Sequence, residues 1–159
     1  MKTLKKMVKK TVIKEKPIAE LTLRKYEKPY KLNDRELVRK LCLSIGLLQP
    51  GDSRDVVVDV LYVLLKGKTN MNSEDVRSMV VNLRKGKKLP LIGITSSNIR
   101  RQLKRLRDMF LIERVANSYR IIENLEFNDV LSEKLEKVML SSVLDRVREY
   151  FKAVEENFK

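Results

Sequence analysis

The sequence contains no histidine, no tryptophan and a single cysteine, Cys42. Without histidine, the side chain that most often shuttles protons and binds metals is missing. One cysteine cannot form an internal disulfide, which fits a reducing compartment such as the cytoplasm. The GxGxxG, GxxxxGK[ST] and GxSxG signatures of nucleotide binding and hydrolase chemistry are also absent. We therefore predict that the protein is not an enzyme and carries no metal or other cofactor.

Glycine, proline and long apolar runs are scarce. Five glycines and four prolines among 159 residues favour helices over a turn-rich β fold. No stretch approaches the roughly 18 consecutive apolar residues of a membrane span, so we expect no membrane partner. The apolar share of 43% is nevertheless enough for an ordinary hydrophobic core.

Positive charge is present in excess and is unevenly distributed. The formal net charge is +14, from 35 basic and 21 acidic residues. Residues 1–31 hold 11 basic and 3 acidic side chains, and residues 76–107 hold 10 basic and no acidic ones. Residues 121–159, in contrast, hold 6 basic and 9 acidic side chains. Such asymmetry between segments is typical of a protein that meets a polyanion.

The pattern divides the chain into three parts. Residues 1–31 form a basic N-terminal arm, which we expect to be partly extended; a flexible solubilising tail is the alternative. Within it, Val12, Ile18, Leu21 and Leu23 form a short strand or pack on the domain. Residues 32–124 form the central domain and residues 125–159 a C-terminal helical segment.

Helix-start signals recur in the central domain. Asn33 caps a helix over 33–46 and forms a capping box with Glu36. Asp52 is expected to cap the next helix, which ends at Gly67 and is apolar nearly all round; its three consecutive valines alternatively suggest a strand. A third helix over 72–86 is expected to be capped by Asn72 or Ser73 and to turn Val76, Met79, Val80 and Leu83 inward. No buried polar cluster in the sequence indicates a ligand pocket.

The segment from Ile94 onward sorts charge from apolar side chains. Thr95 caps a helix in which Ile99, Leu103, Leu106 and Phe110 fall on one face. The opposite face carries Ser97, Arg101 and Lys104, flanked by Arg100 and Arg105. "LIERV", "AN" and "SYRII" follow as strand, turn and strand, with Asn117 expected in the left-handed conformation of the turn.

Three helices, the last amphipathic and basic, followed by LxxL, LIxxV, a turn and YRI, resemble a winged helix-turn-helix domain. MarR-like and ArsR-like regulators and many archaeal-type transcription regulators share this pattern, which covers about residues 52–122 here. The expected fold is therefore mainly α with a small β-hairpin wing. The sequence departs from the family pattern at two points: Phe110 stands where the family usually has glycine, and the connection over 85–94 is longer than usual. Both departures leave the expected fold unchanged but affect the angle at which the domain would dock on DNA.

The resemblance implies a sequence-specific, double-stranded DNA-binding transcription regulator, nucleoid-associated in the cytoplasm. A recognition helix at about 96–108 lies in the major groove, beside a wing at about 111–122. The implied DNA contacts are Ser96, Ser97, Arg100, Arg101 and Lys104 at base edges, Lys85, Lys87, Lys88 and Arg105 at phosphates, and Asn117, Ser118 and Arg120 in the wing. Alternatives are a protein-interaction module in a larger transcription, replication or RNA-processing assembly, and RNA binding by the basic arm.

The C-terminal segment reads as helix with two apolar rows. The first holds Leu131, Leu135 and Val138, and the second holds Leu140, Leu144, Val147, Phe151, Val154 and Phe158. The phase slips near Ser141 and Ser142, so we expect a break there with a serine cap. The length of the second row favours a homodimer contact; folding back onto the central domain is the alternative.

Overall fold

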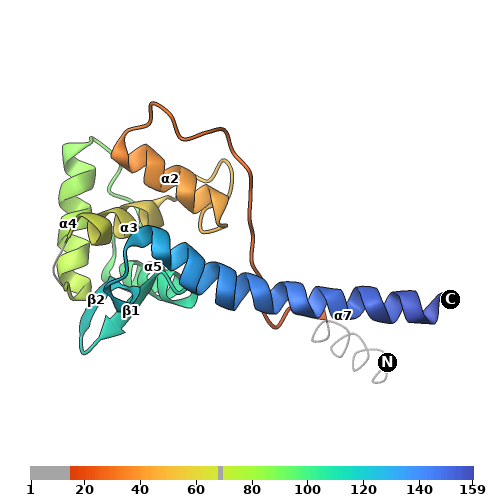
Figure 1. Ribbon diagram of the computed structural model, residues 1–159. Coiled ribbons are helices and arrows are strands. Elements are labelled where there is room, and N and C mark those ends of the chain that lie inside the picture. Colours follow the sequence, from red (N-terminus) through yellow and green to blue (C-terminus); the bar gives the residue numbers. More distant parts are fainter. Residues whose placement is uncertain (1–14, 68–69) are drawn as a thin grey trace, which may run out of the picture.

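The computed structural model describes residues 15–67 and 70–159. Its elements are α2 (Asp34–Ser44), α3 (Val56–Lys66), α4 (Ser73–Gly86), α5 (Ser96–Asp108), β1 (Ile112–Val115), β2 (Ser118–Ile121), the turn η1 (Ile122–Asn124), α6 (Phe127–Val130), the π-helical stretch η2 (Leu131–Leu140) and α7 (Ser141–Asn157). The protein is mainly helical with a small antiparallel hairpin, as predicted. In Figure 1, helices α2 to α5 and the hairpin gather into one body, from which α7 projects.

The predicted helix starts are largely confirmed. The Asn33 side chain accepts a hydrogen bond from the backbone N–H of Glu36, whose carboxylate accepts one from the backbone N–H of Asn33. Asn72 forms the same capping box at α4, and Thr95 caps α5. These starts depend on side chains within three residues of the cap, which is why sequence alone locates them.

The predicted cap of α3 is wrong. The helix begins after Asp55, which makes no side-chain cap hydrogen bond. The carboxylate of Asp52 instead accepts from the backbone N–H of Arg54. Asp55 is held by arginines from other helices, so a tertiary contact takes the carboxylate that a cap would use. The alternative of a strand over the three valines is excluded, since they lie in the first turn of α3.

Helix α3 is the centre of the core and contacts α2, α4 and α5. Ile99, Leu103 and Leu106 of α5 are fully buried, as predicted. Two expectations of burial are wrong: Met79 on α4 and Phe110 after α5 are each 39% exposed. Phe110 leaves the stripe because α5 ends at Asp108 and the backbone turns away.

Three helices end in the same hydrogen-bond pattern. After α2, α4 and α5, a residue with positive φ follows the cap, and the N–H beyond it bonds back to the last turn. This residue is Gly46 after α2, Lys88 after α4 and Phe110 after α5, with φ of 78°, 53° and 58°. Glycine takes this conformation without steric cost, whereas lysine and phenylalanine are strained in it. Phe110 therefore has the backbone conformation that glycine usually adopts at this position, although its residue type differs.

The hairpin forms where predicted, with Ile112 opposite Ile121 and Val115 opposite Ser118. The left-handed φ of its turn falls on Ala116 (53°) and not on Asn117. Met71, between α3 and α4, pairs with Tyr119 through two backbone hydrogen bonds. The hairpin is thereby tied to the helical core at its second strand.

The expected break at Ser141 is wrong. The backbone at Leu140 and Ser141 is helical, neither serine caps a new helix, and the chain is helical without interruption from Phe127 to Asn157. The π-helical stretch η2 lies where the apolar rows change phase. Its i→i+5 hydrogen bonds enclose more residues per turn than an α-helix, so the rows shift without a break. No helix among the described residues is long and apolar enough to cross a membrane.

The described part of the N-terminal arm is extended and runs beside α2. The guanidinium of Arg24 donates to the backbone oxygens of Leu43 and Leu48 at 2.7 and 3.2 Å. No strand forms over residues 15–32, and Ile18 and Leu23 are exposed. Residues 1–14, with Val12, lie outside the described residues.

Candidate nucleic-acid interface

The outer face of α5 presents basic side chains in a row. Arg100, Arg101, Lys104 and Arg107 are exposed; Arg101 and Lys104 lie opposite the buried stripe, and Arg100 and Arg107 lie beside it. Lys104 forms an i,i+4 ion pair with Asp108 at 2.8 Å, and among the described residues no acidic group pairs with Arg100 or Arg101. Two guanidinium groups are therefore presented to solvent on one helical turn.

The two serines at the start of α5 differ in accessibility. Ser96 is partly buried, and the exposed Ser97 hydroxyl lies 3.3 Å from the hydroxyl of the capping residue Thr95. The hydrogen bond at the cap fixes the first turn of α5 and leaves the Ser97 hydroxyl at the surface.

The three lysines at the end of α4 are exposed, as the sequence suggested. Lys85 lies in the last turn, Lys87 is the cap residue and Lys88 has the strained left-handed backbone. Arg77, in the same helix, donates to the backbone oxygen of Ile94 at 2.7 Å and so ties α4 to the start of α5. The lysines lie at the opposite end of the α4–α5 connection from the exposed arginines.

Arg105 has a structural partner that the sequence did not reveal. Its guanidinium is partly buried and donates to the backbone oxygen of Leu47 and to the side chain of Gln102. The contact joins α5 to the loop after α2. Arg105 is therefore less available to a phosphate than the other basic residues of α5.

The wing residues form contacts within the hairpin. Asn117 is exposed at the turn and accepts a hydrogen bond from Arg114 at 2.6 Å. Ser118 is partly buried, and Arg120 pairs with Glu113 across the strands at 2.7 Å. Sequence reasoning missed Arg114, an exposed residue of β1 whose guanidinium lies beside the ring of Tyr119, its neighbour on β2.

A groove of about 780 Å³ adjoins α5 on the side of α3. Arg54, Arg101 and Arg105 lie on its walls together with Asn98 and Gln102. Arg54 precedes the first turn of α3 and is highly exposed. Sequence reasoning missed it because it stands between two aspartates in a segment of nearly balanced charge. Basic side chains thus extend from α5 toward the start of α3.

A buried ionic cluster that sequence reasoning did not predict adjoins this groove. It consists of Arg35 and Arg39 from α2, Asp55 and Asp59 at the start of α3, and Arg84 from α4. Asp59 is fully buried and accepts from both Arg35 and Arg84. Burial by itself raises the pKa of Asp55, but the guanidinium groups of Arg35 and Arg84 outweigh it and hold the pKa of that carboxyl below its usual range. The cluster therefore locks three helices together in charged form.

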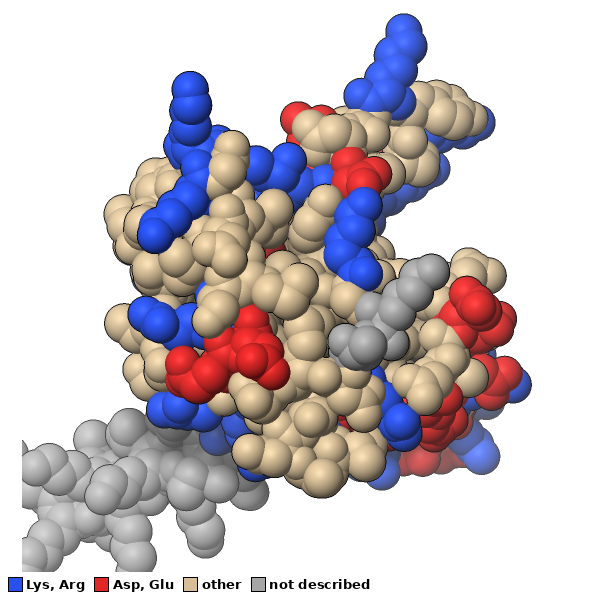
Figure 2. Space-filling model, turned by 90° about the vertical axis from the view of Figure 1, so that its left-hand side faces the viewer, with Lys and Arg blue, Asp and Glu red and all other residues tan. Residues whose placement is uncertain are grey.

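The charges on the face seen in Figure 2 are mixed. Lys and Arg side chains gather mainly along the upper part of this face, with Asp and Glu side chains among and below them. This view looks onto the side where α4 lies in Figure 1. The face on the side of α4 is therefore not uniformly positive.

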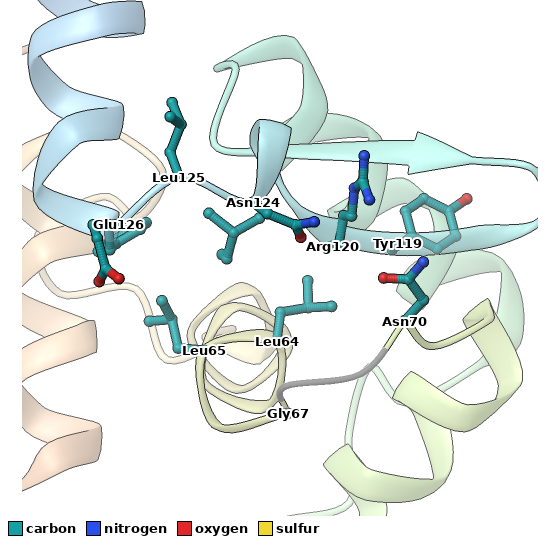
Figure 3. A pocket seen from close by; sticks show the side chains of 11 residues that line it. Leu64, Leu65, Gly67, Asn70, Tyr119, Arg120, Asn124, Leu125 and Glu126 are labelled. Carbon is teal, nitrogen blue, oxygen red and sulfur yellow. The ribbon is translucent and has the colours of Figure 1, made fainter.

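A second hollow, of about 490 Å³, lies between the end of α3, β2 and the start of the C-terminal helix. Figure 3 shows Leu64, Leu65 and Leu125 on its walls, with Asn70, Asn124 and Glu126 around them. No three metal-ligating side chains converge there or elsewhere in residues 15–67 and 70–159. Cys42 lies apart in the core, where burial raises its thiol pKa to about 12.

The predicted dimer residues are exposed. Leu144, Val147, Phe151, Val154 and Phe158 are each at least 40% accessible, and no residue of α7 is buried. Leu140, at the end of η2, is partly buried. The alternative that this helix folds back onto the central domain is therefore wrong for α7.

Comparisons of the chain with models of protein families, with curated proteins and with solved structures find no match.

Proposed function

We propose that the protein is a sequence-specific, double-stranded DNA-binding transcription regulator that acts as a homodimer. The body has the element order of a winged helix-turn-helix domain: α3, the paired segment at Met71, α4, α5 and a hairpin. In this interpretation α5 is the recognition helix and β1–β2 is the wing. It would work in the cytoplasm, at the nucleoid and in contact with the transcription machinery.

The observation that carries the proposal is the sorting of side chains on α5. Its apolar stripe is fully buried against α3 and α4, so the helix cannot rotate about its axis. The opposite face presents Arg101 to solvent, with Arg100 at its edge and Lys104 one turn on. A helix fits the major groove, and an arginine fork bonds guanine O6 and N7 together.

The flanking groups have a different role in this proposal. Lys85, Lys87 and Lys88 at one end and Arg114 at the hairpin are exposed cations that suit phosphates. Phosphate contacts position the protein without reading sequence. Arg105 and Arg120 are held by Leu47 and Glu113, so we assign them to keeping α5 and the wing in place.

The test measures the ratio of affinities for a selected duplex and a random duplex at one salt concentration. Selection from a random duplex pool first supplies the preferred site. Arg101→Ala should then weaken specific binding by about 1–3 kcal/mol and relax one base position. Arg101→Lys keeps the charge but loses the planar fork, so it should lose most of the same specificity.

Lys88→Ala is the matched control, because it removes one exposed cation outside the recognition helix. It should weaken binding to specific and random duplexes about equally. If Arg101→Ala and Lys88→Ala change the ratio alike, the basic face of α5 does not read sequence. The rival role, a protein-interaction module in a larger transcription, replication or RNA-processing assembly, predicts that the isolated protein selects no duplex at all.

A further inference from the structure

Helix α7 carries an apolar row that the described part of the chain leaves uncovered. With Leu140 before it, the row is Leu144, Val147, Phe151, Val154 and Phe158. Phe151 is 75% exposed and Phe158 is 87% exposed. The residues are spaced alternately by four and three, which is the repeat of helices that pair along a seam. A second helix with the same repeat would remove the row from water.

We propose that α7 pairs with α7 of a second copy in antiparallel orientation, so that the two bodies lie at opposite ends of the pair. This inference rests on the homodimer of the proposed function but not on DNA binding. The helix between Val130, the last buried residue before η2, and the proposed twofold axis at Glu149 is about 28 Å long at 1.5 Å per residue. The bodies would stand farther apart than one turn of DNA, which is about 34 Å.

The sizes of the side chains favour the antiparallel orientation. When Glu149 of both copies lies at the same level, Leu140 faces Phe158, Leu144 faces Val154 and Val147 faces Phe151. Every residue of the row is then used, and each Phe meets a smaller aliphatic side chain. Layers of similar total volume pack at the density of protein interiors without voids or strain.

A parallel pair would distribute volume unevenly. Phe151 would face its own copy, and the neighbouring layers would hold two copies of Val147 and two of Val154. Bulky and small layers would alternate. The Phe layers would be strained by overpacking, and the Val layers would leave cavities. Packing therefore disfavours the parallel arrangement.

The charges beside the row favour neither orientation, because Arg148 and Glu155 meet no opposite charge in either, but the contact of Tyr150 with its own copy favours the antiparallel pair. In a parallel pair, Arg148 would lie opposite Val143, and Glu155 opposite Tyr150, so neither charge would meet an opposite charge. In the antiparallel pair, Tyr150 meets Tyr150 of the second copy close to the axis and widens the apolar seam. Arg148 also meets its own copy, but each Arg148 is paired with Asp145 of its own helix at 2.9 Å.

Cysteine crosslinking of the full chain tests the orientation. The native Cys42 is buried with a raised pKa, so it does not interfere. Leu144→Cys and Val154→Cys are made in separate, differently tagged chains, mixed, reduced and reoxidised. A disulfide forms only when the two Cα atoms come within about 7 Å.

The antiparallel pair predicts that the mixed sample forms Leu144→Cys to Val154→Cys heterodimers and that neither variant crosslinks with itself. The two copies of position 144 would be about 15 Å apart along the seam, too far for a disulfide. Glu149→Cys, at the level of the axis but on the outer face, should not crosslink and serves as the control.

Three results would overturn the inference. Crosslinking of each variant with itself would show a parallel pair, which leaves the homodimer and DNA binding intact. Absence of any crosslink in a protein that is dimeric by light scattering would exclude this seam. A monomer at high micromolar concentration would refute the pairing and the homodimer together, while the Arg101 test of DNA binding would still stand.

Discussion

The body and the projecting helix use similar residues in opposite ways. In the body, α3 buries its valines and also buries the carboxylate of Asp59. In α7, leucine, valine and phenylalanine at helical spacing stay exposed, and the ion pairs are all at the surface. The contrast shows that apolar side chains at helical spacing do not by themselves reveal whether other elements of the chain cover them.

Breaking the buried ionic cluster should have the largest effect on stability. Asp59→Ala removes the fully buried carboxylate that pairs with Arg35 and Arg84 and leaves Asp55 facing the three arginines of the cluster, which costs about 3–5 kcal/mol. Asp145→Ala removes the ion pair with Arg148 on α7 and should change stability by about 0.5 kcal/mol or less. Urea unfolding of both variants measures the difference. Equal losses would contradict the contrast between the two regions.

Removing α7 should abolish the dimer and leave the body folded. A stop after Ser141 deletes the exposed row without deleting a buried residue. Light scattering should report a monomer, and the thermal midpoint of the body should stay near that of the dissociated full chain. A truncated protein that still dimerises would place the contact elsewhere.

Acid should weaken the body through Asp55. Because the pKa of this carboxyl is lowered in the folded protein, its stabilisation is complete above the ordinary value of about 3.9 and is lost as the pH falls through the lowered value. Unfolding free energy measured from pH 6 to pH 2 should therefore fall at the acid end. Asp55→Asn should be less stable at pH 6 and should flatten this fall. Asp34→Asn, at a solvent-exposed pair with Lys66, should change the profile little.

Relieving strain at the end of α5 should give the smallest effect, with opposite sign. Phe110 holds a φ of 58°, so Phe110→Gly should stabilise the body by up to about 1 kcal/mol. Gly46→Ala is the reverse control, since its φ is 78° and an added Cβ would lie 2.6 Å from Cβ of Thr22. Thermal unfolding measures both. Destabilisation by Phe110→Gly would mean that the half-exposed ring contributes more than the strain removes.

Local signals explain what could be predicted. The capping residues Asn33, Asn72 and Thr95 bond to backbone groups three residues away, so the neighbouring residues are enough to predict these helix starts. The spacing of Ile99, Leu103 and Leu106 identifies the buried face of α5. The charged residues of this helix are then expected on the face that points to solvent. The alternation through Ile112 and Tyr119 likewise gave the hairpin, because side chains of a strand point to opposite faces in turn.

Tertiary structure decided what depends on distant partners. In the sequence, Arg105 is indistinguishable from the other basic residues of α5. Only the structure shows that it donates a hydrogen bond to the backbone oxygen of Leu47, which is far away in the chain. In the sequence, Asp55 and Asp59 look like ordinary acidic residues near the start of a helix. Only the structure shows that arginines from α2 and α4 surround them. The π-helical stretch let one helix continue through the phase slip at Ser141.

The sequence by itself thus determined the helices, the hairpin and the separation of charge from apolar surface on α5 and α7. Tertiary structure alone decided that the body leaves the apolar row of α7 uncovered, and that a charged cluster lies in the core. The physical reason is range: capping, periodicity and turn formation act over a few residues, whereas burial and ion pairing depend on which segments meet in space.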